Sequence, residues 1–502
     1  MGRRSRSSRP SDAISTHERG RSDPSDLPLR LSAALEAADF TYDAVASLLG
    51  TRAHEALGRN ETTPGLRRTT DKSPLATLTR LFLLQTPVPL GDAERALPHL
   101  LDDLRVEGFL ETSAGEVRAL LDIRPYATDD THLWVTSDLT PGLDGAPVRV
   151  DADHVLGISP AAVSLAQLTL REPVGSALDL GTGCGVQALH LAAHVEAVVA
   201  TDVNRRALRL TRFNAALNRL PDIDVREGSL LDPVAGESFD LIATNPPFVI
   251  SPATGERLVY RDSGLPGDSV VERMVRDAPD HLNPGGWLQV LANWAIHRDV
   301  PWDERVATWV PDDCAALVVQ REVLDPAAYV ELWLKDAGLH GAADYLQRYD
   351  AWLGWFDEQG VEGIGFGWLN LRKLPGESTY LDWPYAVEQP IASAIGDWSW
   401  ATAHPLSESD HLVLRVDVVQ ETTGQPGAED PETIVLRQQR GLRRARQVDT
   451  VEAALAGACD GELSLGQVLD ALATLTQRDP VELRATYLPV VRELLLEGFL
   501  TV

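Results

Sequence analysis

A chain of 502 residues is longer than one hydrophobic core usually supports, so we expect two or three domains. Hydrophobic residues make up 44% of it, enough for a globular core, yet no apolar run approaches the roughly 20 residues that cross a bilayer. The formal net charge of −29 opposes contact with a bare phosphate backbone unless basic side chains gather locally. Composition therefore excludes a membrane-spanning protein and a uniformly basic nucleic-acid-binding protein.

Cysteine and histidine follow no metal-binding or disulfide pattern. Cys184, Cys314 and Cys459 lie far apart, and no Cys-x-x-Cys pair occurs. The 12 histidines show no ligand spacing. We therefore predict no metal site and no disulfide framework, which is typical of a protein of the reducing cytoplasm.

Residues 1–26 are rich in Arg and Ser, and no apolar segment follows them. A secretory signal needs such a segment, so we predict a disordered tail. Electrostatic tethering to nucleic acid through this tail is the alternative.

Segment 27–150 has apolar residues at helical spacing, which predicts a mostly helical N-terminal accessory domain. The apolar positions are Leu31, Leu35, Ala38, Leu78, Leu81, Phe82, Leu97, Leu100, Leu101 and Leu104.

In segment 151–375, short β-branched runs alternate with helical stretches. The predicted strands are Ser176–Leu180, Ala197–Thr201, Ile223–Glu227, Phe239–Thr244, Trp287–Ala292, Ala315–Gln320 and Ile364–Leu371. The predicted helices begin at about Val186 and cover Arg205–Leu217 and Ser269–His281. This alternation predicts right-handed crossovers and a mostly parallel sheet with helices on both faces.

The first of these strands leads into Gly181-Thr182-Gly183-Cys184-Gly185, which opens the following helix. Glycines at such a turn let the backbone approach a ligand closely, and the spacing is not the dinucleotide form Gly-x-Gly-x-x-Gly. Asp202 ends the next strand, where a carboxylate can accept hydrogen bonds from both ribose hydroxyls. Loop and acid together predict a site for a nucleoside cofactor. A glycine turn with a helix-capping Asp is the alternative.

Further positions complete this predicted site. Asp179, just before the loop, is expected to orient the loop amides or to meet an amino group of the cofactor. Ser229 and Leu230 follow the third strand, where we expect the adenine contact, with Asp232 as the nearest acid. Cys184 is interpreted as a packing residue rather than a nucleophile, since no His is near it in sequence.

The fourth strand is followed by Asn245-Pro246-Pro247-Phe248. The prolines fix the backbone and leave the Pro246 carbonyl free to accept, while Asn245 supplies a side-chain carbonyl. Two acceptors can hold both hydrogens of a planar –NH2 group and stabilise its nitrogen as charge develops in the transition state. Phe248 can stack on a planar target. The motif predicts N-methylation chemistry, and a rigid proline turn is the alternative.

Segment 376–502 is predicted to be an α+β C-terminal accessory domain. It contains a basic stretch from Arg437 to Arg446, which we interpret as a solvated surface or as a local nucleic-acid contact. Its end, Glu497-Gly498-Phe499-Leu500, repeats the form of Glu107-Gly108-Phe109-Leu110. A helix that stops at Gly before a strand is found in winged-helix modules, so both ends are winged-helix candidates, and a coincidental helix stop is the alternative.

Stretch 150–300 resembles the HemK-like and "methyltransferase small domain" group of class I S-adenosylmethionine-dependent N-methyltransferases. The likeness extends to the loop from Arg261 to Asp268 and to the Pro-Gly-Gly turn after Leu282. His154 to Pro160 stands where that group has its pre-core substrate segment, but the usual Pro-Arg-Pro signature is absent. The flanks look like those of an uncharacterised actinobacterial-type methyltransferase family.

The resemblance implies a Rossmann-like seven-stranded core with S-adenosylmethionine as cofactor. It makes Ile364–Leu371 the antiparallel seventh strand and 325–360 an aromatic-rich helical insertion before it. It implies methylation of a release-factor glutamine or of an amino group on guanine or adenine. From the motif, the aromatic residues and the winged ends we favour a nucleic-acid base, RNA in particular. A protein glutamine, as in a release factor, or a small molecule is the alternative.

Overall fold

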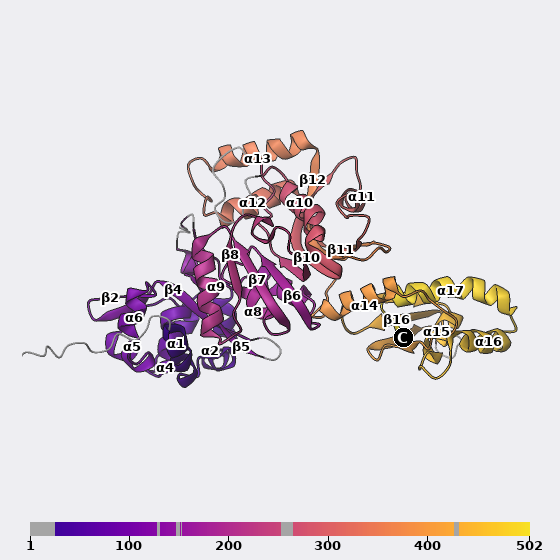
Figure 1. Ribbon diagram of the computed structural model, residues 1–502, viewed down its shortest axis with the longest axis horizontal. Coiled ribbons are helices and arrows are strands. Elements are labelled where there is room, and N and C mark those ends of the chain that lie inside the picture. The colour runs from indigo at the N-terminus through magenta and orange to yellow at the C-terminus, as the bar shows by residue number, and fades with distance from the viewer. Residues whose placement is uncertain (1–25, 128–130, 147–150, 152, 253–264, 426–430) are drawn as a thin grey trace, which may run out of the picture.

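The computed structural model describes residues 26–127, 131–146, 151, 153–252, 265–425 and 431–502. The predicted tail, apart from Asp26, lies outside these residues, as do Arg261 to Gly264. Figure 1 shows the N-terminal elements packed beside a central sheet and the C-terminal elements reaching away from its other side. No helix among the described residues is long and apolar enough to cross a membrane.

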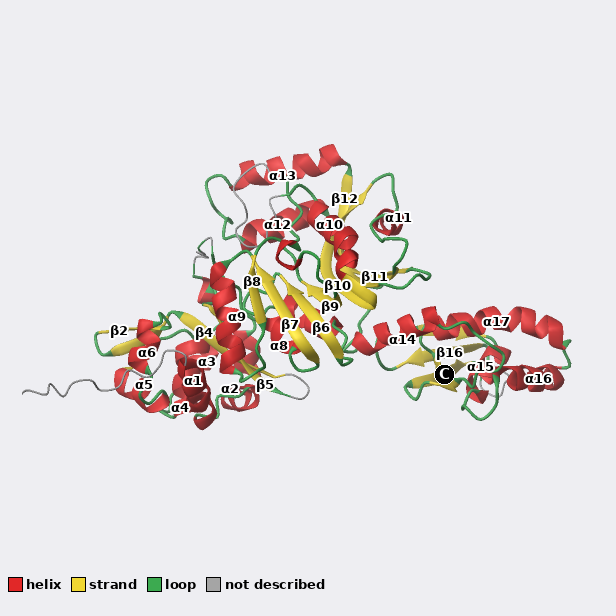
Figure 2. Ribbon diagram, in the orientation of Figure 1, coloured by secondary structure: helices red, strands yellow, loops and turns green. Residues whose placement is uncertain are grey.

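The centre of the molecule is one sheet with helices on both faces (Figure 2). Its strands are β6 (Val174–Leu180), β7 (Val195–Asp202), β8 (Asp224–Glu227), β9 (Phe239–Thr244), β10 (Leu282–His297), β11 (Ala315–Leu324), β12 (Val361–Arg372) and β13 (Thr379–Asp382). Its helices are α7 (Pro160–Leu168), α8 (Val186–Leu191), α9 (Arg205–Leu217), α10 (Ser269–Asp277), α11 (Trp302–Ala307), α12 (Pro326–Asp336) and α13 (Tyr345–Gln359).

The strand order is β13-β11-β12-β10-β9-β6-β7-β8. β6 to β10 pair in parallel, whereas β12 lies between β10 and β11 and is antiparallel to both. This is the predicted class I methyltransferase sheet, including its antiparallel strand over Ile364–Leu371, so the fold prediction is confirmed. β13 adds an eighth strand, parallel to β11, that the sequence did not predict.

Alternate side chains of β6 enter two different cores, as the two-residue period of a strand requires. Ala177 belongs to a buried cluster that includes Leu189 of α8 and Leu208 of α9. Leu178 belongs to another cluster that includes Val271 of α10. Burial on both faces leaves the carboxyl ends of the strands as the place for a ligand.

The N-terminal part contains the predicted helices and, in addition, strands that periodicity did not predict. The elements are α1 (Leu27–Ala37), α2 (Tyr42–Leu57), α3 (Thr63–Arg68), α4 (Pro74–Leu78), β1 (Val88–Pro89), α5 (Leu90–Ala96), α6 (Leu101–Val106), β2 (Leu110–Ser113), β3 (Glu116–Ala119), β4 (Leu121–Ala127) and β5 (His132–Asp138). Asn214 of α9 bonds to both backbone groups of Thr136 in β5, at 2.8 and 2.9 Å. The N-terminal part is therefore fastened to the core through α9.

The C-terminal part combines helices with a small antiparallel sheet. Its elements are α14 (Ala392–Ala403), β14 (Val413–Leu414), β15 (Val418–Thr423), β16 (Thr433–Gln438), β17 (Ala445–Val448), α15 (Thr450–Ala458), α16 (Leu465–Thr476), α17 (Pro480–Leu496) and β18 (Leu500–Thr501).

The two Glu-Gly-Phe-Leu segments have the same backbone geometry. Gly108 and Gly498 have φ of 77° and 75°, and the nitrogens of Phe109 and Phe499 each donate to a carbonyl five residues back at 2.8 Å. The strand after each helix then joins a small sheet. In the first sheet β3 lies between β1 and β2, and in the second β14 lies between the Asp460 bridge and β18. Both ends thus share a helix that stops at Gly and a following strand that joins a small sheet, and the winged helix stays a prediction for each.

Candidate methyltransferase site

The glycine loop leaves β6 in a conformation that side chains disfavour. Gly181, Gly183 and Gly185 have φ of 78°, 58° and 90°, the left-handed region where glycine is favoured. A Cβ on Gly185 would also lie 3.1 Å from the Thr211 side chain of α9. The backbone nitrogens of Gly181 and Thr182 both donate to the Thr201 carbonyl at 2.9 Å, which ties the loop to the end of β7.

The buried Asp179 carboxylate binds the glycine loop and the start of α8 through hydrogen bonds. It is buried, and its Oδ2 accepts from the Thr182 hydroxyl at 2.6 Å and from the Ala188 nitrogen of α8 at 2.9 Å. Burial raises the pKa of this carboxyl to about 7. Of its two predicted roles, orientation of the loop is the one these contacts support.

Asp202, at the end of β7, reaches the same loop. Its Oδ2 accepts from the Gly183 nitrogen at 2.9 Å and its Oδ1 from the Asn204 nitrogen at 2.8 Å. Burial raises its pKa from the ordinary value. The structure therefore brings the predicted ribose-binding acid and the glycine loop into direct contact.

Ser229 and Leu230 follow β8, one strand further along the same edge. Ser229 is exposed, while Leu230 is half-buried and has φ of 47°. Asp232 is exposed, and its backbone nitrogen donates to the Ser229 carbonyl at 3.0 Å. These residues form the third segment of the predicted cofactor site.

Asn245 follows β9 directly, and β9 is the neighbour of β6. The hydroxyl of Thr244 donates to the Leu180 carbonyl at 2.8 Å, which holds the start of the Asn-Pro-Pro-Phe motif beside the start of the glycine loop. The Oδ1 atom of Asn245 is buried and has no hydrogen-bond partner among the described residues. A buried carbonyl without a donor is uncommon in native proteins, and functional sites are where such atoms are found.

Phe248 is half-buried, and its ring meets that of Trp333 of α12 edge to face at 6.1 Å. Ile250, two residues on, is fully buried and is held by the insertion that forms α12 and α13. Its nitrogen donates to the Tyr329 hydroxyl at 2.9 Å, and its carbonyl accepts from Trp352 Nε1 at 3.0 Å. The insertion thus fixes the segment that leaves the motif. Sequence reasoning did not identify Tyr329.

Trp352 and Trp355, three residues apart on α13, are two of the aromatic residues of the insertion. Trp352 is only 5% exposed and packs in the same cluster as Tyr329 and Phe356. Trp352 is therefore a core residue rather than a surface on which a base can stack. The sequence also did not reveal the ion pair between Asp268 and Arg305. The Arg305 guanidinium donates to both carboxylate oxygens of Asp268, at 2.7 and 2.8 Å.

Cys184 is fully buried within the loop, and burial raises the pKa of its thiol to about 12. A thiol that stays protonated is not a nucleophile, in agreement with the packing role. No group of three or more His, Cys, Asp or Glu residues in the described ranges could hold a metal ion.

Two arginines of the basic stretch in the C-terminal part are ion-paired. Arg437 makes two hydrogen bonds to Glu421, at 2.7 and 3.0 Å. Arg446 pairs with Glu493 at 2.7 Å and with Glu497 at 3.1 Å. Arg437 therefore lies on a solvated, ion-paired surface, as the simpler interpretation of the stretch expects, whereas the Arg446 side chain is half-buried.

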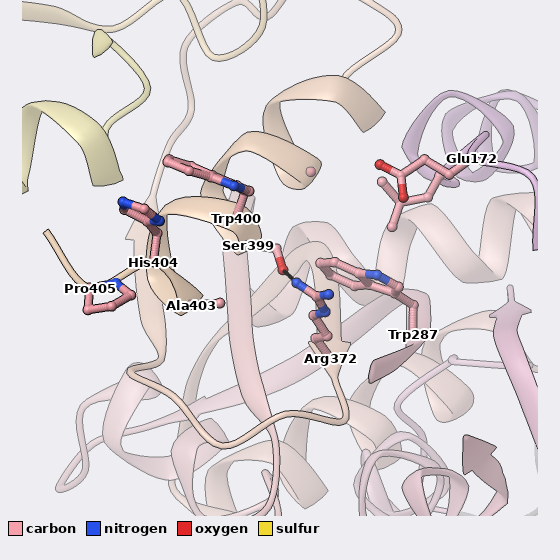
Figure 3. A pocket seen from close by; sticks show the side chains of 10 residues that line it. Glu172, Trp287, Arg372, Ser399, Trp400, Ala403, His404 and Pro405 are labelled. Carbon is pink, nitrogen blue, oxygen red and sulfur yellow. Dashed lines mark hydrogen bonds between the residues drawn. The ribbon is translucent and has the colours of Figure 1, made fainter. Parts of the chain in front are cut away.

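A cavity of about 350 Å³ lies away from these residues (Figure 3). Glu172 lines it just before β6 begins, and Trp287 of β10 lines it where that strand pairs with Leu241, before the end of β9. Arg372 of β12 and Trp400 of α14 complete its walls. It is therefore at the amino ends of the strands, opposite Asn245.

The sequence of the chain matches known methyltransferases. Residues 159–300 match the model of the methyltransferase small domain, and two domains of unknown function match residues 37–120 and 397–502. A release factor glutamine methyltransferase of Deinococcus radiodurans is 33% identical over 226 residues, which cover 42% of this chain and 80% of the relative.

Other relatives match over shorter stretches. A release factor glutamine methyltransferase of Xylella fastidiosa is 36% identical over 128 residues, 23% of this chain and 46% of the relative. A ribosomal RNA small subunit methyltransferase C of Alcanivorax borkumensis is 29% identical over 148 residues, 30% of this chain and 39% of the relative. The chain thus spans about half the length, or less, of these two relatives.

The glycine loop, the acid at the end of β7 and the strand order fit S-adenosylmethionine, the cofactor of the matched family. The chain belongs to the methyltransferase small domain family of S-adenosylmethionine-dependent methyltransferases.

Proposed function

We propose that this protein transfers a methyl group to the nitrogen of a planar –NH2 group that Asn245 and Pro246 hold. The observation that carries the proposal is the Asn245 Oδ1 atom, which is buried and has no donor among the described residues. An amino group of the substrate would supply the missing hydrogen bond.

Asn245 Oδ1 and the Pro246 carbonyl would accept the two hydrogens of the target amine. Such an amine is a weak nucleophile because its lone pair is delocalised. As its nitrogen becomes tetrahedral and positive, hydrogen bonds to the two acceptors strengthen, so they stabilise the transition state more than the ground state. Phe248 would pack on the planar group and align it. The proton leaves after methyl transfer, and no strong base is needed.

The cofactor, when bound, supplies an electrophilic methyl group on a sulfonium. We assign its binding to the backbone of Gly181, Thr182, Gly183 and Gly185, with Asp202 for the ribose hydroxyls. Asp179 orients this loop through its bonds to Thr182 and Ala188. Ser229 and Leu230 would border the adenine, and Asn245 would close the site between cofactor and target amine.

For the substrate we propose the side-chain amide of a protein glutamine. Relatives named as release factor glutamine methyltransferases support this assignment. The charge of −29 also suits a basic protein partner better than a polynucleotide. In addition, α6, the helix that ends just before Gly108, opens with Asp102 and Asp103, and acidic side chains there repel phosphates.

An amino group on an RNA base is the second candidate. It is supported by the relative named as an rRNA methyltransferase and by the place of Phe248, three residues after Asn245, where a ring can stack on a base.

Methyl-labelled cofactor and purified protein, added to an extract of cells that lack the protein, test both candidates. Label that is sensitive to protease and found in N-methylated glutamine supports the protein substrate. Label that is sensitive to RNase supports the RNA base. Label on an oxygen, a carbon or a primary aliphatic amine would contradict the proposal itself.

A further inference from the structure

The cavity of about 350 Å³ at the amino ends of the strands lies between the central sheet and the C-terminal part (Figure 3). One wall comes from the segment before β6 and from β10 and β12, and the other comes from α14 and the turn after it. The charged, polar and aromatic side chains that line it are Glu172, Trp287, Arg372, Ser399, Trp400 and His404. Pockets that bind small molecules begin at about 300 Å³, so the cavity can hold one.

The Arg372 guanidinium has no acidic partner in the part of the chain that the structure describes. Its Nη1 atom donates to the Ser399 hydroxyl at 2.6 Å, and its Nε atom donates to the Gly285 carbonyl at 3.4 Å. The guanidinium carbon lies 5.7 Å from the centre of the Trp287 ring. None of these neighbours is charged, and Arg372 is half-buried, so its charge is not compensated. The Nη2 atom remains to donate, and the Ser399 hydroxyl beside it can donate in turn.

Glu172 brings the opposite charge to the same cavity. It is exposed, and its carboxylate makes no hydrogen bond or ion pair with any described residue, Arg372 included. Helix α14 passes close to it at Gly396, where a Cβ would lie 3.9 Å from Glu172 Oε1. His404 differs from both, because its ring is paired with Asp410 at 3.0 Å. The cavity therefore contains one uncompensated charge of each sign.

Two indole rings give the cavity flat apolar surface. Trp400 is 40% exposed although it is a large aromatic residue, and the His404 ring stacks on it at 4.4 Å with an interplanar angle of 20°. Trp287 is half-buried beside Arg372. Aromatic walls of this kind bury flat apolar groups well, so they favour a ligand with an aromatic body.

We propose that this cavity binds a free aromatic α-amino acid. The carboxylate of the ligand accepts from Arg372 Nη2 and from the Ser399 hydroxyl, its ammonium group donates to Glu172, and its ring packs on Trp400. A ligand with a single charge would leave either Glu172 or Arg372 uncompensated, whereas a zwitterion compensates both. The bound amino acid would join the central sheet to α14. The site is separate from Asn245, and its test does not depend on the proposed methyl transfer.

Titration calorimetry of the full chain with L-phenylalanine tests the site. S-adenosylhomocysteine is present at saturation, so that the proposed cofactor site is filled and cannot take the amino acid. We expect L-phenylalanine to bind. N-acetyl-L-phenylalanine lacks the ammonium group and phenethylamine lacks the carboxylate, so each should bind at least about tenfold more weakly, since each loses a hydrogen bond between charged groups.

Glu172→Gln removes one charge from an exposed side chain and should leave the fold intact. We expect it to raise the Kd for L-phenylalanine about 10- to 100-fold and to leave the Kd for N-acetyl-L-phenylalanine unchanged, because only the ammonium group contacts Glu172. The matched control is Glu196→Gln, exposed near the start of β7, which should keep the wild-type Kd. No binding of L-phenylalanine by the wild type, an equal Kd for its N-acetyl form, or an unchanged Kd in Glu172→Gln would overturn the proposal.

Discussion

The Tyr329 hydroxyl of α12 accepts a hydrogen bond from the Ile250 nitrogen at 2.9 Å, and both residues are fully buried. Trp352 of α13 donates to the carbonyl of the same Ile250 at 3.0 Å. Both backbone groups of a residue just after the Asn-Pro-Pro-Phe motif are therefore held by the insertion. The insertion is thus packed onto the segment that follows the proposed target-amine motif rather than being a separate unit.

Tyr329→Phe removes only the hydroxyl and leaves a buried nitrogen without its partner. We expect the free energy of unfolding to fall by about 1–3 kcal/mol, which is the usual cost of such a loss. We also expect kcat to fall while the KM for the cofactor stays the same, because the glycine loop is untouched. Urea unfolding and steady-state kinetics measure the two effects. The control is Tyr385→Phe, since Tyr385 is 63% exposed. Equal unfolding free energies and equal kcat in the two variants would show that Tyr329 does not support the motif.

Asp202→Ala should weaken cofactor binding. The carboxylate holds the Gly183 nitrogen and is assigned to the ribose hydroxyls, and hydrogen bonds to a charged group contribute about 1.5–3 kcal/mol each. We expect the Kd for S-adenosylhomocysteine, measured by calorimetry, to rise roughly 10- to 100-fold. Glu227→Gln, at the exposed end of β8, should leave the Kd unchanged. An unchanged Kd in Asp202→Ala would show that the ribose binds elsewhere.

Asp179 should make the stability of the protein depend on pH. Burial raises its pKa from 3.8 to about 7, so the folded state holds a proton that the unfolded state releases. The contribution of Asp179 to the free energy of unfolding then decreases as pH rises from about 4 to about 7, and it changes no further above that range. Asp179→Asn should remove this part of the slope in urea unfolding at a series of pH values. Asp224→Asn, exposed on β8, should keep it, and identical slopes for both variants would contradict the prediction.

The parts of the site that directly follow strands of the sheet could be predicted from the sequence. The glycine loop, Asp202 and Asn245 each follow a strand of a parallel sheet, and the carboxyl ends of such strands share one edge. The antiparallel strand β12 and the insertion before it could also be predicted, but from the family resemblance rather than from the strand pattern.

Features that depend on contacts distant in sequence could not be predicted. Tyr329 bonds to Ile250 across 79 residues, and no local pattern marks that pairing. β13 is a four-residue edge strand with half-buried and exposed side chains, so it lacks the apolar alternation that identifies a strand. The strands β4 and β5 were missed for a related reason, because β5 is buried along most of its length and shows no alternation.

The central claim is that Asn245 Oδ1 holds the target amine during methyl transfer. Its most direct test is single-turnover methyl transfer by Asn245→Ala to the substrate identified with labelled cofactor, with S-adenosylhomocysteine binding measured in parallel. We expect a rate lower by about 10²–10³-fold, the usual effect of removing one transition-state hydrogen bond, with cofactor affinity reduced far less. A rate in Asn245→Ala equal to that of the wild type would contradict it.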